Sequence, residues 1–152
     1  MARVFEDDFT KIQADMVSIC LEYVEERADK VFVYYADELG MVYCDYFFQI
    51  HGKIVHRHKL NTVLAENEPE YDVSASLQSQ VLDILLRDAN KLEKLFEQNN
   101  RKPPMEIRMV YDVHSHAFEA KVRYDSICTE KNGKSPISLF YEWYEEMEKA
   151  SV

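Results

Sequence analysis

The stretch KVFVYYADELGMVYCDYFFQI, Lys30–Ile50, decides the fold, because it holds two runs of strand-forming residues around one short break. β-Branched and aromatic residues dominate both Lys30–Asp37 and Met41–Ile50, and these residue types favour strands. The break at Glu38–Gly40 contains a glycine, which is typical of a hairpin turn. The sequence therefore predicts an antiparallel hairpin over this stretch.

Three further strands are predicted on the C-terminal side of the hairpin. The turn His51–Lys53 leads into IVHRHKL, Ile54–Leu60, which predicts a third strand. Farther along, MEIRMVYDV, Met105–Val113, and AFEAKVRYD, Ala117–Asp125, alternate apolar and polar side chains. A period of two indicates a sheet with one buried and one solvated face. His114–His116 between them predicts a tight turn.

Amphipathic helices are predicted before, between and after these strands. Apolar residues four and three positions apart predict one helix over Phe5–Glu26 and another over Ser74–Asn100. After a loop over Thr129–Ser135, the pair Ser135-Pro136 supplies an N-cap and a first helical residue for a terminal helix, Ile137–Ala150.

The predicted order is α-β-β-β-α-β-β-α. We expect an α+β, two-layer fold, with the helices packed on one face of a five-stranded, mainly antiparallel sheet. A length of 152 residues suits one domain over residues 1–152.

The charge is strongly acidic, with 28 Asp and Glu against 18 Lys and Arg, for a formal net charge of −10. Such a protein repels nucleic acid and anionic membranes and attracts basic partners. The N-terminus MARVFEDDF lacks the basic and apolar segments of an export signal. Three widely spaced cysteines without a C-x-x-C pair favour reduced thiols. We expect a cytoplasmic protein that contacts neither membrane nor nucleic acid directly.

Catalytic and cofactor motifs are missing. The sequence has no glycine-rich phosphate loop, G-x-S-x-G, H-E-x-x-H or C-x-x-C, and only three glycines in all. We therefore expect a protein that is not an enzyme and needs no cofactor.

Four of the five histidines occur in two Val-His-x-His stretches, with His56 and His58 in one and His114 and His116 in the other. A strand directs residues i and i+2 to one face, so His56 and His58 would share a side of the third strand. The four imidazoles form a metal site only if that strand and the later turn are neighbours. The sequence favours ordinary sheet and turn residues, and leaves a small metal- or ligand-binding module as the alternative.

Two acidic segments also contain aromatic residues: ENEPEYD, Glu66–Asp72, and FYEWYEEMEKA, Phe140–Ala150. Acidic residues around Tyr and Trp suit capture of a basic protein surface, because charge steers the encounter and aromatic residues anchor it. In the alternative interpretation, Trp143 and Tyr144 are core residues and the acids are merely solvated. The candidate contacts are Glu66, Glu68, Glu70, Asp72, Glu142, Glu145, Glu146 and Glu148.

Several local strings resemble the YezG-like immunity proteins over most of the chain. These are the hairpin of KVFVYYAD and CDYFFQI, the helix end KLEKLFEQN, the hairpin VYDVHSHAFEAKVRYD, and Ser135-Pro136 followed by Trp143 and Tyr144. The chain departs from the family pattern at Met105, at His116-Ala117 and in lacking an Arg shortly after Pro136, and so resembles a divergent member.

The resemblance implies an inhibitor without enzymatic activity. Members of this family neutralise secreted toxins, commonly nucleases, of type VII secretion systems. The implied partner is a cognate toxin domain, bound in the cytoplasm before export. The acidic charge fits independently, since a nuclease needs a basic surface to hold its polyanionic substrate.

Overall fold

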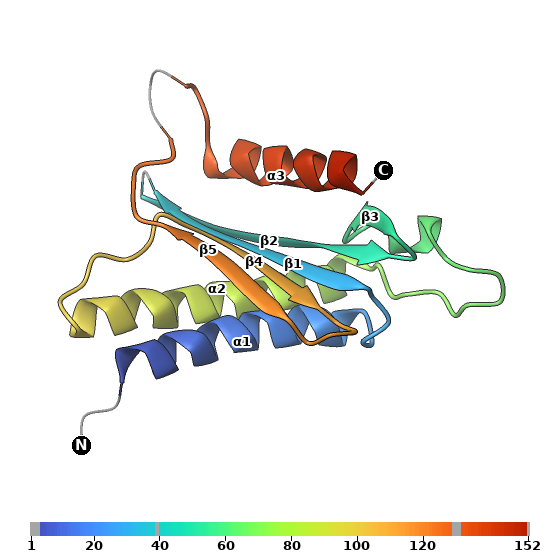
Figure 1. The fold of residues 1–152 in the computed structure, drawn as a ribbon, viewed down its shortest axis with the longest axis horizontal. Helices are drawn as coiled ribbons and strands as arrows, with labels where there is room; N and C mark the ends of the chain where they lie inside the picture. The colour runs from blue at the N-terminus through green and yellow to red at the C-terminus, as the bar shows by residue number, and fades with distance from the viewer. Residues whose placement is uncertain (1–3, 39, 129–131, 152) are drawn as a thin grey trace.

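The computed structural model describes residues 4–38, 40–128 and 132–151, and these form three α-helices and a five-stranded antiparallel sheet (Figure 1). In chain order the elements are α1 (Phe5–Tyr23), β1 (Lys30–Glu38), β2 (Met41–Ile50), β3 (Lys53–His56), the 3₁₀ turn η1 (Leu60–Thr62), α2 (Ala75–Gln98), β4 (Glu106–Asp112), β5 (Phe118–Arg123) and α3 (Pro136–Ala150). Leu39 in the first hairpin and residues 129–131 in the loop predicted before α3 lie outside the described residues. The α+β class, the element order and the antiparallel sheet are confirmed.

Strand β1 is the middle strand of the sheet, whose order is β3-β2-β1-β4-β5. It pairs antiparallel with β2 on one side and with β4 on the other, so that Tyr34 lies opposite both Asp45 and Arg108. Its residues from Val31 to Ala36 are all buried. A strand covered on both faces reads as a continuous apolar run, which explains why this stretch does not alternate.

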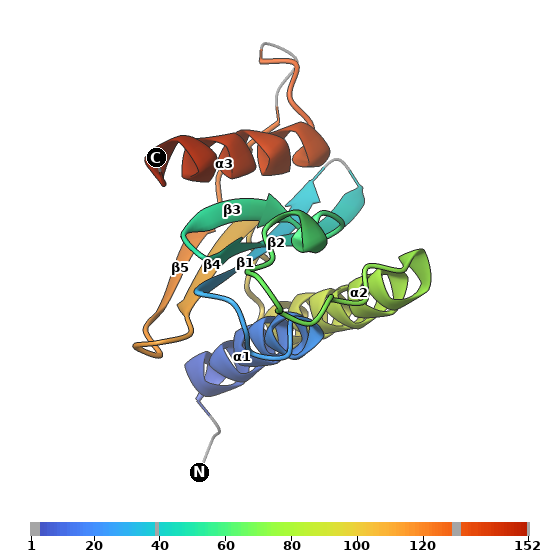
Figure 2. The ribbon, with the colours of Figure 1, turned by 90° about the vertical axis from the view of Figure 1, so that its right-hand side faces the viewer.

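The helices cover both faces of the sheet. Figures 1 and 2 show α1 and α2 side by side on one face and α3 on the other. The prediction that all helices share one face is therefore wrong. Alternate residues of β1 supply two cores, and Val33 belongs with Met16 and Leu85 to the core under α1 and α2. Those between them, including Phe32 and Tyr34, belong to the core under α3.

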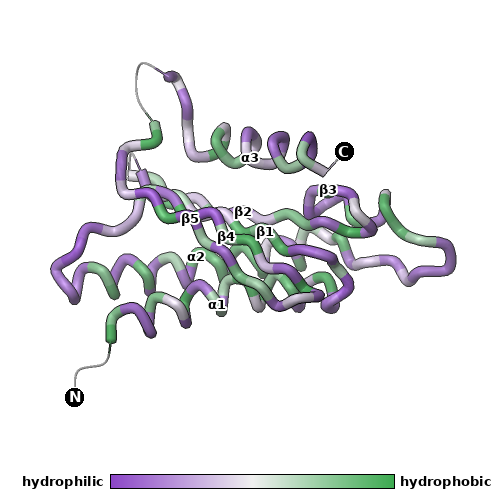
Figure 3. The backbone as a smooth tube through the Cα atoms, in the orientation of Figure 1, coloured by the Kyte–Doolittle hydropathy of each residue, from purple (hydrophilic) through white to green (hydrophobic). Residues whose placement is uncertain are grey.

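The core under α3 is mainly aromatic. Phe32 stacks on Phe47 with 4.5 Å between ring centroids, and Trp143 packs edge-on to Phe47 at 5.1 Å. Phe140 and Trp143 are 0% and 4% exposed, so Trp143 belongs to the core rather than to an exposed anchor. In Figure 3 the central strands are mainly hydrophobic and the connecting loops mainly hydrophilic.

Local capping signals account for where α2 and α3 begin. Ser135 caps α3 in a capping box with Ser138, and Pro136 is the first helical residue, as predicted. Ser74 caps α2 by accepting a hydrogen bond from the Leu77 N–H at 3.2 Å. No helix among the described residues is both long enough and apolar enough to cross a bilayer.

Candidate functional site

The acidic segment Glu66–Asp72 lies against the chain that follows α1. Arg27 holds it there by donating a hydrogen bond to the Pro69 carbonyl at 2.6 Å and by stacking 3.9 Å from the centroid of the Tyr71 ring. The same guanidinium lies 3.3 Å from a carboxylate oxygen of Glu68. A single arginine thus joins a loop to a helix end far away in sequence.

Glu68 is occupied by this internal network. Besides Arg27, its carboxylate contacts the ring of His51 at 3.0 Å and accepts a hydrogen bond from the Ala65 N–H at 3.0 Å. These contacts, with the Ala65 N–H first and His51 next, lower the pKa of Glu68 to about 2. Glu68 is therefore a structural residue of the loop, whereas its neighbours Glu66, Glu70 and Asp72 are exposed.

The loop acids adjoin acids at the C-terminal end of α1. Glu25 lies 3.9 Å from Arg27, and Glu22, Glu25 and Glu26 are all exposed. Glu25 and Glu26 have left-handed backbone conformations, with φ of 56° and 60°, which end the helix at Tyr23. We define the acidic end as Glu22, Glu25, Glu26, Glu66, Glu70 and Asp72. The α1 acids escaped the sequence prediction because the wet face of any amphipathic helix has the same pattern.

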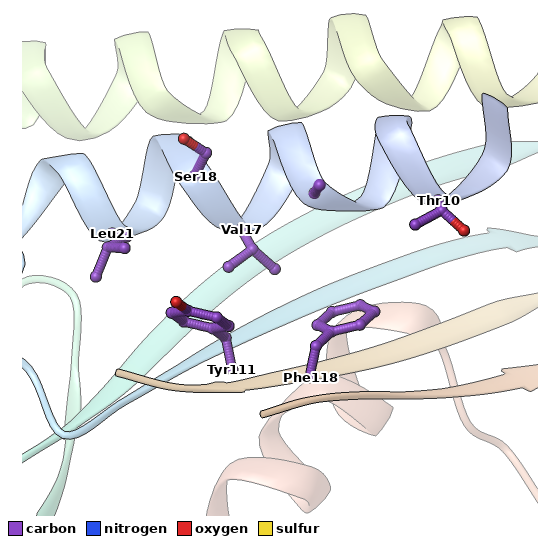
Figure 4. Close-up of a pocket in the computed structure, with 7 residues that line it drawn as sticks. Thr10, Val17, Ser18, Leu21, Tyr111 and Phe118 are labelled. Atoms are coloured by element: carbon purple, nitrogen blue, oxygen red, sulfur yellow. The ribbon is translucent and has the colours of Figure 1, made fainter. Parts of the chain in front are cut away.

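An apolar groove of about 380 Å³ runs along α1 beside the β4–β5 hairpin. Figure 4 shows Thr10, Val17 and Leu21 of α1 facing Tyr111 of β4 and Phe118 of β5. We call this the α1–β5 groove, and its lining is Thr10, Ala14, Val17, Ser18, Leu21, Tyr111 and Phe118. Phe118 remains 40% exposed at this groove.

The groove opens onto the acidic end. A second hollow, of about 570 Å³, is lined by Ser18, Leu21, Glu22, Glu25 and Glu26, and so shares Ser18 and Leu21 with the groove. An apolar surface with an acidic margin suits a protein partner that presents apolar and basic side chains together. The sequence carries no signal for this groove, since its two sides come from opposite ends of the chain.

The acids of α3 lie on the other face of the sheet. Glu142 forms an ion pair with Lys134 at 2.9 Å, and Glu146 lies 3.7 Å from Arg108, which also contacts the buried Glu106. Glu145 and Glu148 are exposed. The eight acids predicted as contacts are therefore divided between two faces, and they do not form one surface.

The two histidine pairs lie at opposite edges of the sheet. His56 ends β3, the first strand in the sheet order, whereas His114 and His116 lie in the turn before β5, the last strand. His114 contacts Asp29 at 3.5 Å and His116 contacts the Tyr111 hydroxyl at 2.8 Å. Residues 4–38, 40–128 and 132–151 contain no group of three or more His, Cys, Asp or Glu side chains placed to hold a metal ion. The structure does not assemble the four-imidazole site.

His58 is not in a strand, contrary to the prediction for Ile54–Leu60. β3 ends at His56 because the next residue turns inward, where Arg57 contacts Asp45 at 2.8 Å and Gln78 at 2.6 Å. The rings of His56 and His58 still lie 4.1 Å apart. His56 is 5% exposed among aromatic residues, and burial lowers its pKa to about 4. His56 is thus a neutral core histidine.

One buried carboxyl links α1 to α2. Asp88 on α2 is 2% exposed, and Asp15 on α1 lies near enough to affect its ionisation. Burial, and after it the contact with Asp15, raises the pKa of Asp88 to about 7. The raised pKa therefore favours an uncharged Asp88 side chain between α1 and α2.

Comparison of the sequence with known proteins gives no relative. No protein-family model matches the chain, and no curated protein matches it.

Proposed function

We propose that this chain is an immunity protein, which binds a cognate secreted toxin in the cytoplasm of the producing cell and neutralises it without enzymatic activity or a cofactor. The proposed toxin is a nuclease with a basic surface. The resemblance to YezG-like immunity proteins supplies this class, and the net charge of −10 supports a basic partner.

One observation carries the proposal: the acidic end adjoins the exposed α1–β5 groove. Charge at the margin would steer a basic domain toward the site, and burial of apolar side chains in the groove would hold it there. The hollow beside His58 also contains Arg57 and Gln78, and the hollow beside Glu146 contains Arg108 and Lys121, so basic side chains lie at both and neither has a purely acidic margin. The proposed contact surface is therefore the acidic end together with the groove.

Co-expression tests the function. The toxin-like gene beside this one is expressed alone and then with the wild-type chain, and growth is measured. We expect toxicity alone and restored growth in the presence of the chain. If no adjacent toxin exists, or the wild-type chain does not restore growth, the immunity function is wrong.

A matched pair of variants tests the surface. E22Q/E25Q/E26Q removes three charges from the acidic end, and E142Q/E145Q/E148Q removes three from α3. We expect the first variant to bind the purified toxin about tenfold or more weakly at low salt, mainly through slower association, and the second to bind nearly as the wild type does. Loss of binding only in the α3 variant would assign the contact to the opposite face and leave the immunity function standing.

A further inference from the structure

Strand β5 is an open edge of the sheet. It is the last strand in the order β3-β2-β1-β4-β5, and β4 is its one partner within the described part of the chain. Figure 2 shows β5 at the margin with no element beyond it. The strand FEAKVR contains no proline, so every residue of it retains a backbone N–H.

The register with β4 shows which backbone groups face outward. Asp112 donates to the Ala117 carbonyl at 2.9 Å, and Val110, Arg108 and Glu106 lie opposite Glu119, Lys121 and Arg123 in turn. Hydrogen-bonded pairs alternate along an antiparallel ladder, so these odd-numbered residues of β5 bond to β4. The N–H and C=O groups of Phe118, Ala120 and Val122 therefore point away from the sheet.

The side chains of this edge carry opposite charges that lack partners. Glu119 and Lys121 lie on the face toward α3, and neither forms an ion pair within residues 4–38, 40–128 and 132–151. Lys121 even lies opposite Arg108 on β4, and like charges at such a position are destabilising. On the face toward α1, Phe118 is 40% exposed.

We propose that β5 pairs antiparallel with β5 of a second copy of this chain, with Ala120 opposite Ala120. This register joins the outward-facing residues of both strands, so about six backbone hydrogen bonds form. It places Glu119 of each copy opposite Lys121 of the other and Phe118 opposite Val122. Each charge gains an opposite partner, and each Phe118 gains an apolar neighbour.

The sequence of β5 favours this register, and it favours a second copy of the chain as the pairing partner. A register centred on Lys121 would place two lysines opposite each other, which costs stability. Edge strands of natural proteins commonly carry charges that oppose pairing with another chain. Here the charges of β5 are self-complementary, so they favour a second copy over an unrelated strand.

Sedimentation equilibrium of the purified chain tests the pairing. We expect a reversible monomer–dimer equilibrium, and a chain that stays monomeric at millimolar concentration overturns the proposal. E119K should weaken the dimer about tenfold or more, because both Glu–Lys pairs become Lys–Lys pairs. The double variant E119K/K121E should restore it. E145K, the same change at an exposed position of α3, should leave the equilibrium as in the wild type.

Cysteine crosslinking tests the register. In the proposed pairing A120C faces its own copy, within the Cα separation that a disulfide spans, whereas V122C does not. The native Cys20, Cys44 and Cys128 are buried and do not compete. We expect mild oxidation to give a crosslinked dimer of A120C and none of V122C. Equal crosslinking of both variants, or failure of the double charge reversal to restore a dimer weakened by E119K, would overturn the register. Circular dichroism of each variant confirms that it is folded.

Discussion

Replacement of Asp88 by Asn should stabilise the protein at alkaline pH. The Asp88 carboxyl is 2% exposed, and its Oδ2 atom has no hydrogen-bond partner. Burial and the neighbouring Asp15 raise its pKa from the ordinary 3.8 to about 7. The folded state thus favours the protonated, uncharged carboxyl. An Asn amide is nearly isosteric with this protonated form and stays uncharged at every pH.

The sign and size of the effect follow from linkage between protonation and folding. Because the folded-state pKa is the higher one, the stabilising contribution of Asp88 is complete below about pH 3.8 and is lost as pH rises through about 7. Each pKa unit is worth about 1.4 kcal/mol, so ionisation of Asp88 costs the folded state up to about 4 kcal/mol at pH 8. Lys91 lies 3.8 Å away and is 62% exposed. Losing that ion pair costs the Asn variant only about 0.5 kcal/mol.

Urea denaturation at pH 4 and pH 8, followed by circular dichroism, measures the effect. We expect D88N to raise the free energy of unfolding by about 2–4 kcal/mol at pH 8 and to change it little at pH 4. D83N is the matched control, because Asp83 lies on the same helix and is exposed, and it should change stability by less than about 0.5 kcal/mol. Wild-type and D88N stabilities that run parallel across this pH range would refute the assigned pKa and its cause.

Two more predictions concern the core under α3. Because the pKa of His56 is lowered to about 4, its contribution to stability is complete above about pH 6.5 and is lost as pH falls toward 4. H56F should therefore flatten the loss of stability between pH 6.5 and 4 in urea titrations, and an unchanged slope would contradict a neutral, buried imidazole. W143A should lower the free energy of unfolding by about 3–5 kcal/mol, because it opens a cavity between α3 and the sheet. I137A is the control on α3, because the Ile137 side chain is 44% exposed, and it should cost less than about 1 kcal/mol. Equal effects of W143A and I137A in thermal melts would show that α3 does not cover this face of the sheet.

The pattern of neighbouring residues along the chain determined most of the secondary structure. The runs Lys30–Asp37 and Met41–Ile50 formed the predicted hairpin, and the apolar stripes formed the predicted helices, because periodicity and capping act between residues close in sequence. Strand β3 is the exception. It ends at His56 because Arg57 turns to reach Asp45 and Gln78, and such distant partners leave no trace in the local pattern.

Only the tertiary structure decided where α3 packs. Both sides of β1 are apolar, and the sequence does not say which helix covers which side. Phe32 and Tyr34 face the opposite way from Val31 and Val33, so burying both sets requires helices on both faces. The need to remove two apolar surfaces from water thus converts the expected two-layer arrangement into one with a central sheet.

For the candidate site too, the sequence determined some features and the tertiary structure decided others. Composition determined that the protein is acidic and that acids concentrate in Glu66–Asp72 and the terminal helix. The tertiary structure decided which acids act together, because Arg27 draws the loop onto the end of α1 and occupies Glu68. It also created the α1–β5 groove, whose two walls are brought together by the pairing of strands remote in sequence. Each residue carries its charge whatever the fold, but the fold decides which charged residues lie together on one surface.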